Sequence, residues 1–354
     1  MSEQSTDQDV IVEQTTDRNL VLSIEELRTY FHTQIGLVKA VDGVNFNLNK
    51  GGTLGLVGET GCGKSVTALS ILRLVPRPGR IEGGKCNFYW DEDKVIDTVS
   101  LNPHGEKMRS IRGNEMGIVF QEPMTSLNPV YTIGQQIIES VEYNQNLDKK
   151  EAREQAIEML EKVHMSAPEQ RVDEYPHELS GGMRQRAMIA IALSCNPSLL
   201  FADEPTTALD VTIEAQILNL LEELKQEFRM STVIITHDLG VVGETTDRMV
   251  VMYMGKVMER GSTEEIFYDP QHPYTKGLMN SIPRIGKKEE LTAISGSVPS
   301  PYHLPNGCYF APRCPEAMDV CGVEIPPTVQ TGPGRYVQCW LYQDRGEDVE
   351  RQGK

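Results

Sequence analysis

The sequence predicts an α/β protein whose parallel sheet is covered by helices on both faces. Three short apolar stretches have the length of buried strands, at 53–57, 199–202 and 233–236. Helical patterns follow the first and second of them, from 64 onward and at 213–228. Strands that alternate with helices and consist of continuous apolar residues are typical of parallel sheets buried on both sides.

Composition and charge narrow the possible functions. The chain has 354 residues, of which 39% are hydrophobic, so we expect a main domain with a smaller addition. Its 51 acidic residues outnumber 34 basic ones and give a net charge of −17, which disfavours binding to nucleic-acid backbones. Apolar runs are far shorter than the roughly 18 residues of a membrane span, so the sequence predicts none.

The chain divides by composition into four segments. Residues 1–19 are polar and acidic and lack the apolar centre of a signal peptide, so we expect a disordered leader and a cytosolic protein. The body covers 20–280, with strands at 20–58 and 249–257 and a mostly helical part at about 122–195. The proline-rich stretch 281–343 holds four cysteines and predicts a separate small appendage. Residues 344–354 form a polar tail.

Local patterns place several helices within the body. The helix after 64 should run past Leu72 and Val75 until Pro76 stops it. Asp148 followed by Glu151 has the pattern of a capping box at the start of an amphipathic helix.

A glycine-rich loop carries the first chemical pattern. It reads Gly58-Glu59-Thr60-Gly61-Cys62-Gly63-Lys64-Ser65 and fits G-x-x-x-x-G-K-[ST] between a strand and a helix. The glycines allow backbone N–H groups to surround a phosphate at the positive end of the helix dipole. Lys64 would reach the β- and γ-phosphates and the Ser65 hydroxyl would bind Mg²⁺. The alternative is an ordinary glycine-rich turn, which the flanking strand and helix disfavour.

The metal of such a loop needs a carboxylate at the end of another buried strand. The apolar run 199–202 is followed by Asp203 and Glu204. We expect Asp203 to hold Mg²⁺ through water and Glu204 to polarise the water that attacks the phosphate. Many strands end in an acid, so this pattern gains its weight from the phosphate loop upstream.

A third pattern, Ser180-Gly181-Gly182, lies between them. Ser180 suits a helix N-cap, and the two glycines leave N–H groups available to an anion, although such a stretch alone could be a cap and no more. In this order with the phosphate loop and Asp203-Glu204, it resembles the signature sequence of ABC ATPases. The resemblance extends from about Leu20 through nearly all of the chain.

The resemblance implies the fold of an ABC-type P-loop ATPase, with a RecA-like parallel core, an antiparallel β subdomain and an inserted helical subdomain. In that family two ATPase domains enclose each nucleotide between the phosphate loop of one and the signature of the other. Gln121 matches the residue that senses the metal and couples to the membrane partner, and His237 the one that contacts the γ-phosphate. Asp210 matches the loop that crosses the dimer interface, and Phe31 the aromatic that stacks on adenine, with Tyr30 as the alternative.

Longer stretches resemble the branch of the family that takes up oligopeptides, dipeptides and nickel. Met183 stands where many ABC proteins carry Gln. The further matching stretches are 122–129, 175–178, 184–186, 203–212, 272–278 and 281–283.

Four of the seven cysteines lie in the C-terminal segment, namely Cys308, Cys314, Cys321 and Cys339. Four thiolates suit an iron–sulfur cluster or zinc, and the segment shows no core that would order it without a metal. Its context resembles the C-terminal extension of peptide-importer ATPases, some of which carry a [4Fe-4S] cluster. Zinc and free or partly paired thiols are the alternatives. His303 is a conceivable substitute ligand for zinc, but we expect it to be a surface residue. Cys86 and Cys195 are expected to be small buried residues.

The resemblance implies an ATP-hydrolysing subunit of a binding-protein-dependent ABC importer for di- and oligopeptides, at the cytoplasmic face of the cell membrane. Its partners would be a second, related ATPase subunit, two permease subunits and an extracytoplasmic substrate-binding protein. Uptake of nickel or another small solute is the nearest alternative. A soluble ABC-type ATPase acting on nucleic acid or ribosomes is a rival of another class, disfavoured by the single set of motifs and the absence of sustained heptads.

Overall fold

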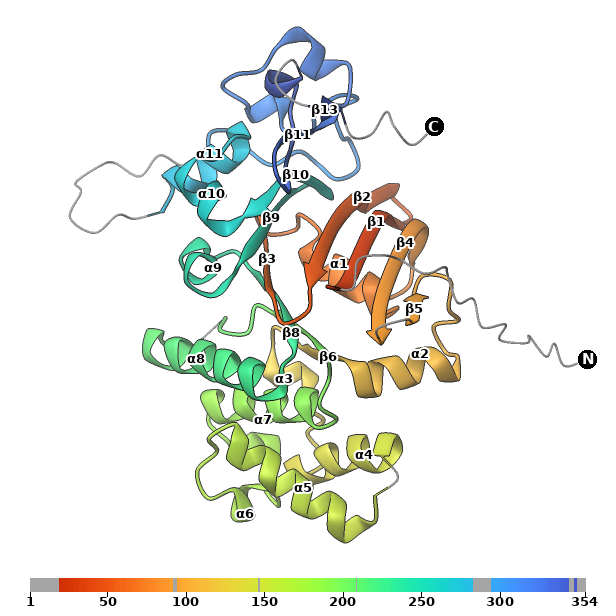
Figure 1. Ribbon diagram of the computed structural model, residues 1–354, viewed down its shortest axis with the longest axis vertical. Coiled ribbons are helices and arrows are strands. Elements are labelled where there is room, and N and C mark those ends of the chain that lie inside the picture. Colours follow the sequence, from red (N-terminus) through yellow and green to blue (C-terminus); the bar gives the residue numbers. More distant parts are fainter. Residues whose placement is uncertain are drawn as a thin grey trace, which may run out of the picture. The chain divides into compact units, whose positions relative to one another are not determined.

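The computed structural model describes residues 19–91, 94–145, 147–207, 209–282, 294–343 and 347–348 (Figure 1). The chain forms two compact units. The first consists of residues up to 22, 48–52 and 87–235, and the second of 23–47, 53–86 and 236 onward. The predicted leader lies outside the described residues except for Asn19, and so does the predicted polar tail except for 347–348.

The first unit contains a parallel sheet. Strands β6 (Met116–Val119), β7 (Leu199–Asp203) and β8 (Ser231–Thr236) run side by side in the same direction, and β7 and β8 are buried along their whole length. At the start of the segment 87–235, β5 (Lys94–Asp97) pairs antiparallel with the end of β4 (Gly79–Asp91). The prediction of a parallel sheet built from continuous apolar strands is confirmed.

Helices fill most of the stretch that the sequence predicts to be helical. The longer ones are α4 (Ile133–Gln145), α5 (Lys149–Lys162) and α7 (Gly181–Leu193), followed after β7 by α8 (Val211–Phe228). Short helical elements are α2 (Glu106–Ser110), a π turn (Ile111–Glu115), α3 (Pro123–Ser126), α6 (Pro168–Arg171) and a 3-10 turn (Pro176–Glu178). No helix in the described ranges is long and apolar enough to cross a membrane.

The predicted capping box at the start of α5 is confirmed. The Asp148 carboxylate accepts hydrogen bonds from the N–H groups of Lys150 and Glu151, at 2.8 and 2.9 Å. The Glu151 carboxylate in turn accepts the N–H of Asp148 at 3.1 Å. These bonds satisfy N–H groups that have no partner within the helix.

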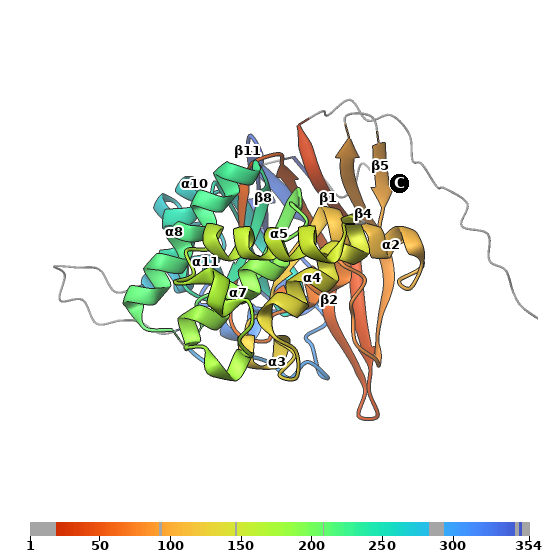
Figure 2. The ribbon, with the colours of Figure 1, turned by 90° about the horizontal axis from the view of Figure 1, so that it is seen from below.

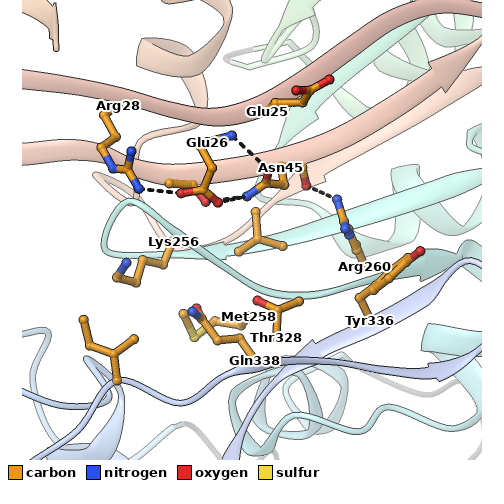
Figure 3. Close-up of a pocket in the computed structure, with 13 residues that line it drawn as sticks. Glu25, Glu26, Arg28, Asn45, Lys256, Met258, Arg260, Thr328, Tyr336 and Gln338 are labelled. Atoms are coloured by element: carbon orange, nitrogen blue, oxygen red, sulfur yellow. Dashed lines mark hydrogen bonds and ion pairs between the residues drawn. The ribbon is translucent and has the colours of Figure 1, made fainter. Parts of the chain in front are cut away.

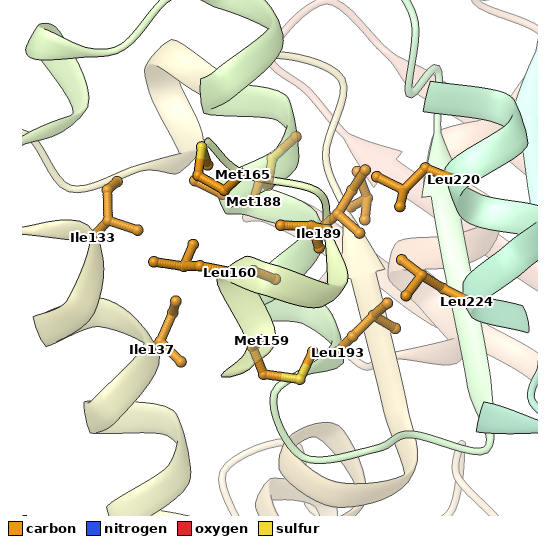
Figure 4. Packing of buried hydrophobic residues seen from close by; sticks show 14 of the residues in the cluster. Ile133, Ile137, Met159, Leu160, Met165, Met188, Ile189, Leu193, Leu220 and Leu224 are labelled. Atoms are coloured by element: carbon orange, nitrogen blue, oxygen red, sulfur yellow. The ribbon is translucent and has the colours of Figure 1, made fainter. Parts of the chain in front are cut away.

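An apolar core joins the four long helices of this unit to its sheet. Figures 1 and 2 show α4, α5 and α7 side by side, and Figure 4 shows their side chains interlocked. Leu160 of α5 is fully buried in the middle of this cluster. Near it lie Ile133 and Ile137 of α4 and Ile189 and Leu193 of α7, and the cluster continues to Leu220 of α8.

The second unit contains two sheets. In one, β3 (Thr53–Val57) pairs parallel with β9 (Arg248–Tyr253), and β10 (Lys256–Ser262), β12 (Arg335–Gln338), β11 (Thr328–Gly332) and β13 (Glu347–Asp348) continue it antiparallel. In the other, β2 (Leu37–Asn49), β1 (Leu20–His32) and β4 lie in that order. The helices are α1 (Lys64–Ile71), α9 (Leu239–Thr245), α10 (Thr263–Tyr268) and α11 (Pro273–Asn280).

Two predicted elements of this unit differ in extent. The expected strand 249–257 is two antiparallel strands, because the chain turns at Met254 and Gly255, whose φ angles are 47° and 81°. The expected helix from 64 to 75 ends at Ile71, because Arg73 has a left-handed φ of 57° that a helix cannot continue through.

The C-terminal segment is not the separate appendage that the sequence predicts. Strand β12 pairs with β10, with Val337 opposite Glu259. Tyr309 and Phe310 are buried in one core with Tyr274 of α11 and with β9. The expectation that the segment lacks a core is therefore wrong. Its few apolar residues are scattered along the sequence and meet those of the body only after folding.

We expect Leu160→Ala to lower the free energy of unfolding by about 2–5 kcal/mol, since it leaves a cavity among four helices. Val130→Ala is the matched control, because Val130 is 72% exposed in the same unit. Urea unfolding followed by circular dichroism measures both. Equal stability of the two variants would contradict the packing described for α5.

Candidate functional site

The phosphate loop has a backbone that side chains would disrupt. Gly58 has φ 149°, and a Cβ there would lie 2.2 Å from the carbonyl oxygen of Met252. Gly63 has φ 106°, and a Cβ there would lie 2.1 Å from the carbonyl oxygen of Ala40. Both positions therefore need glycine, for conformation as well as for space. This geometry goes beyond that of an ordinary turn.

Lys64 begins α1 and is 5% exposed. Its Nζ donates hydrogen bonds to the carbonyl oxygens of Gly58 at 2.8 Å and Glu59 at 3.3 Å. The ammonium group therefore lies inside the curve of the loop, where an anion would be bound. Cys62 is also buried, and burial raises the pKa of its thiol, so it is a protonated space-filling residue here.

Glu59 of the loop is held by two residues that the sequence analysis did not select as site residues. Its N–H donates to the Tyr274 hydroxyl at 2.9 Å. Its carboxylate accepts two hydrogen bonds from the Arg313 guanidinium, at 2.7 and 3.0 Å. Both partners come from the last third of the chain, and short motifs reveal nothing about contacts between such distant segments.

In the first unit, parallel strands bring two predicted catalytic residues together. Gln121 follows β6 and Glu204 follows β7, and these strands are neighbours. The Gln121 Nε2 donates to Glu204 Oε2 at 2.8 Å, and the Thr207 hydroxyl donates to the same oxygen at 2.8 Å. The two hydrogen bonds hold this carboxylate oxygen in one orientation. Thr207 is a further site residue that the sequence analysis did not select.

Asp203 and Glu204 occupy different environments. Asp203 ends β7 and is only 7% exposed. Glu204 leaves the strand with a left-handed φ of 46°, and its N–H donates to the carbonyl of Ile235 at 2.8 Å. A non-glycine residue in this conformation is strained, which is common where a side chain must be aimed at a site.

Two helix starts contain the other predicted residues of this unit. Ser180 is the N-cap of α7 and accepts the N–H of Met183 at 3.4 Å, and Gly181 and Gly182 form the first turn. Asp210 is the N-cap of α8 and accepts two N–H groups at 3.0 and 3.1 Å. Its neighbour Ala208 lies outside the described residues. The observed role of Ser180 and Asp210 is thus helix capping.

Phe31, Tyr30 and His237 lie in the second unit, with the phosphate loop. The Tyr30 hydroxyl donates to Asp42 at 2.6 Å, and burial together with this bond raises its pKa. Tyr30 is therefore already engaged, which leaves Phe31 as the better candidate for stacking. His237 is exposed directly after β8. The structure thus groups these residues in one unit and Gln121, Glu204 and the signature in the other.

The four C-terminal cysteines line one small cavity of about 10 Å³, together with the buried His272. Burial raises the pKa of Cys308 to about 11 and of Cys339 to about 12, so these thiols are protonated at neutral pH. Within the described ranges, no group of three or more Cys, His, Asp or Glu side chains is arranged to hold a metal ion. Such a cavity has room for about one water molecule. The donor set suits a metal, and in this arrangement the thiols enclose little space.

The other cysteine and histidine predictions have clear outcomes. Cys86 in β4 and Cys195 after α7 are buried, as expected. His303 is exposed and does not line the cysteine cavity, whereas His272 does. Burial lowers the pKa of His272 to about 3, so its ring is neutral, and its Nδ1 accepts the N–H of Tyr274.

A larger cavity of about 650 Å³ lies elsewhere in the second unit (Figure 3). It is lined by none of the residues predicted to bind a nucleotide. Lys256 pairs with Asp42 at 3.2 Å, and Arg260 donates to the carbonyl of Asn45 at 2.5 Å and stacks over Tyr336. The cationic groups of these two residues are thus engaged by protein partners.

Two protein families match the sequence. The family described as ABC transporter matches residues 41–207, which include the phosphate loop, the signature and Asp203-Glu204. The family described as oligopeptide/dipeptide transporter, C-terminal region, matches residues 258–321, which include Tyr274 and Arg313. The two families account for separate parts of the chain.

Curated relatives match over almost their full length. The oligopeptide transport ATP-binding protein AppD of Bacillus subtilis is 53% identical over 93% of this chain and 98% of its own. The dipeptide transport ATP-binding protein DppD of the same organism is 46% identical, over 94% and 98%. A probable peptide ABC transporter ATP-binding protein, y4tR of Sinorhizobium fredii, is 49% identical over 91% and 95%.

Solved structures match the body of the chain. The ATP-binding cassette MJ0796, in a dimeric post-hydrolysis state bound to ADP and Pi, has a TM-score of 0.60 at 27% identity and covers 68% of this chain and 98% of its own. CbiO1 of Clostridium perfringens, part of the ABC transporter complex CbiONQ, has a TM-score of 0.58 at 28% identity, over 71% and 92%. The expected cassette fold is confirmed.

We expect Gly63→Ala to weaken nucleotide binding at least about tenfold, because the added Cβ would force the loop away from Ala40. Gly83→Ala is the control, since an added Cβ there meets nothing within 4 Å. A fluorescent ATP analogue titrated against both variants measures the difference. Wild-type affinity in Gly63→Ala would contradict the tight packing of the loop.

Proposed function

The chain belongs to the ATP-binding proteins of ABC transporters, in the oligopeptide and dipeptide branch, and we propose that it hydrolyses ATP to drive the import of di- and oligopeptides. One observation carries the proposal. The complete set of ATP motifs stands in a chain that is 53% identical, over 93% of its length, to an oligopeptide transport ATP-binding protein. Both the phosphate loop and the C-terminal region of that branch are present.

The phosphate loop would bind the triphosphate of ATP. Its N–H groups, its glycines and Lys64 offer a positive cradle, and the buried lysine would exchange the carbonyls of Gly58 and Glu59 for phosphate oxygens. Phe31 would stack on the adenine. Oxygen ligands suit Mg²⁺, and the Ser65 hydroxyl and the Asp203 carboxylate would hold it. The bound ion would neutralise phosphate charge.

Glu204 would act as the general base. A water molecule attacks the γ-phosphorus, the carboxylate takes its proton, and the bond to the β-phosphate oxygen breaks to give ADP and inorganic phosphate. The hydrogen bonds from Gln121 and Thr207 support this role, because they hold one carboxylate oxygen and leave Glu204 oriented. His237 would contact the γ-phosphate and Gln121 would sense the metal.

The signature and its neighbours would act on a second ATPase subunit. Ser180, Gly181 and Gly182 at the start of α7 would meet the phosphates bound by the partner, and Asp210 would lie at the dimer interface. We propose a related rather than identical partner, two permease subunits and an extracytoplasmic binding protein. The chain would then be a peripheral subunit at the cytoplasmic face of the membrane, closing on ATP and reopening after hydrolysis.

Peptides are the proposed substrate because the named relatives are oligopeptide and dipeptide transport proteins. Nickel or another small solute is the alternative within the same branch. The rival function on nucleic acid finds no support in the relatives named above, and the charge of −17 disfavours it.

The four cysteines are proposed to bind an iron–sulfur cluster or zinc. The support is that all four cysteine side chains line one cavity, and four thiolates are a known ligand set for both groups. Since the cavity holds only about 10 Å³ and the buried thiols are protonated, metal binding would require them to lose protons and move apart. The role of the site would be to cross-link the segment that carries Phe310 and Arg313.

We expect Glu204→Gln to bind ATP and to lose ATP turnover by at least about 100-fold, with loss of peptide uptake, because the amide cannot take a proton from water. Glu227→Gln is the matched control, since Glu227 pairs with Lys162 on the surface. Phosphate release and labelled-peptide uptake by the reconstituted complex measure both. Normal turnover in Glu204→Gln would refute the assignment of the base.

We expect anaerobically purified protein to contain either iron or zinc. An iron–sulfur cluster would make the protein absorb visible light, whereas bound zinc would not. Cys314→Ser and Cys339→Ser should each remove the metal, whereas Cys195→Ser should keep it. Metal assays and absorbance spectra make the comparison. Metal-free wild-type protein from cells grown with both metals would end the proposal.

A further inference from the structure

We infer that Arg313 of the C-terminal region is a positioning residue of the phosphate loop, which neutralises the Glu59 carboxylate and thereby sets the affinity of the loop for a nucleoside triphosphate. The inference rests on the proposed function, because it assumes that the loop binds ATP. It gives the C-terminal region a direct part in nucleotide binding.

The pair is a specific contact between a buried guanidinium and a partly buried carboxylate. Two nitrogens of the Arg313 guanidinium each meet one oxygen of Glu59, at 2.7 and 3.0 Å. The Arg313 side chain is 4% exposed, and that of Glu59 is 27% exposed. A two-point guanidinium–carboxylate pair of this kind fixes orientation as well as charge. Exposed ion pairs lack this restriction.

Arg313 is itself rigidly placed. Its Nε donates to the carbonyl of Ser295 at 3.2 Å, and its Nη1 donates to the Tyr253 hydroxyl at 3.3 Å. Its guanidinium lies 5.8 Å from the ring centre of Tyr253 and 5.9 Å from that of Phe310. The bond to Glu59 raises the pKa of Arg313, so the charge is permanent. The position of the Arg313 guanidinium is therefore fixed by contacts other than Glu59, so the arginine can hold Glu59 in place.

A second contact ties the same residue to the same region. The Glu59 N–H donates to the hydroxyl of Tyr274, whose side chain is fully buried. Tyr274 packs against Tyr253 and Phe310, with ring centres 4.7 and 5.3 Å apart. The main chain of Glu59 is thus held by Tyr274 and its side chain by Arg313. Both partners lie against the rings of Tyr253 and Phe310. Loop and C-terminal region are joined as one body at this point.

The charge of Glu59 acts where phosphate would bind. Its carbonyl accepts a hydrogen bond from Lys64 Nζ at 3.3 Å, so Glu59 is in contact with the lysine of the loop. Burial raises the pKa of Cys62 in the middle of the loop, Lys64 lowers it, and the charge of Glu59 adds to the rise, so this charge is felt within the loop. Without Arg313, the phosphate loop would carry an uncompensated anion, which would repel a bound polyphosphate. Arg313 removes that repulsion.

The test uses the full chain and a fluorescent ATP analogue. We expect Arg313→Gln to raise the Kd about tenfold at about 50 mM salt and by much less at about 500 mM, since ions screen the exposed carboxylate. Glu59→Gln should tighten binding about threefold, and the double variant should return to within about threefold of wild type. Charge compensation of this kind does not arise from a loss of packing alone.

Arg335→Gln is the matched control. Arg335 is a buried arginine of the same region that pairs with Glu259 at 3.3 Å and Asp269 at 3.1 Å. It should lower the melting temperature and leave the Kd and its salt dependence unchanged. Arg313→Lys, which keeps the charge, should bind ATP within about threefold of wild type and replaces Arg313→Gln if that variant does not fold.

The outcomes separate the inference from the proposed function. ATP binding that is indifferent to Arg313→Gln, a double variant as weak as Arg313→Gln, or a tenfold loss in Arg313→Lys would each overturn the inference alone. A wild-type chain that binds no ATP would overturn the proposed function, and the inference with it.

Discussion

The close approach of three backbone segments at the phosphate loop is the constraint on which the second unit depends. The carbonyls of Ala40 and Met252 stand where side chains at positions 63 and 58 would be, so only glycine allows the loop to curl. Gly255 completes the contact. Its N–H donates to the carbonyl of Cys62 and its carbonyl accepts the N–H of Asp42, both at 2.8 Å. The turn between β9 and β10 places Gly255 against the loop, where both of its backbone groups form these hydrogen bonds.

The C-terminal region also contacts the phosphate loop, through residues far from it in the sequence. Tyr274 and Arg313 hold Glu59, and the ring of Phe310 connects them to the cavity lined by the cysteines. Its strand β12 extends the sheet that contains β9 and, through it, β3. The region that resembles the peptide-importer extension is thus part of the structural support of the nucleotide loop.

In the first unit, the order of the parallel strands determines which site residues meet. Parallel strands end at a common edge, so Gln121 after β6 and Glu204 after β7 meet there without any special sequence between them. The helices on this sheet begin at residues whose side chains cap them, among them Ser180 and Asp210. Ser180 and Asp210, which we propose to act at a dimer interface, thus have a local structural role in the single chain as well. Capping fixes where each helix starts, and so fixes where its N–H groups point.

Local chemistry determined much of this protein without tertiary information. The phosphate loop, Asp203-Glu204, the signature and the capping box at Asp148 are each contained within a few residues, and the alternation of apolar stretches was enough to predict a parallel sheet. Tertiary structure decided what depends on contacts between residues farther apart: the bond from Tyr30 to Asp42, the buried core of the C-terminal region and the pairing of Arg313 with Glu59. The physical reason is the separation along the sequence between the interacting residues. A cap or a glycine loop is stabilised by its own neighbours, whereas a buried ion pair between residues 59 and 313 forms only after the intervening chain has folded.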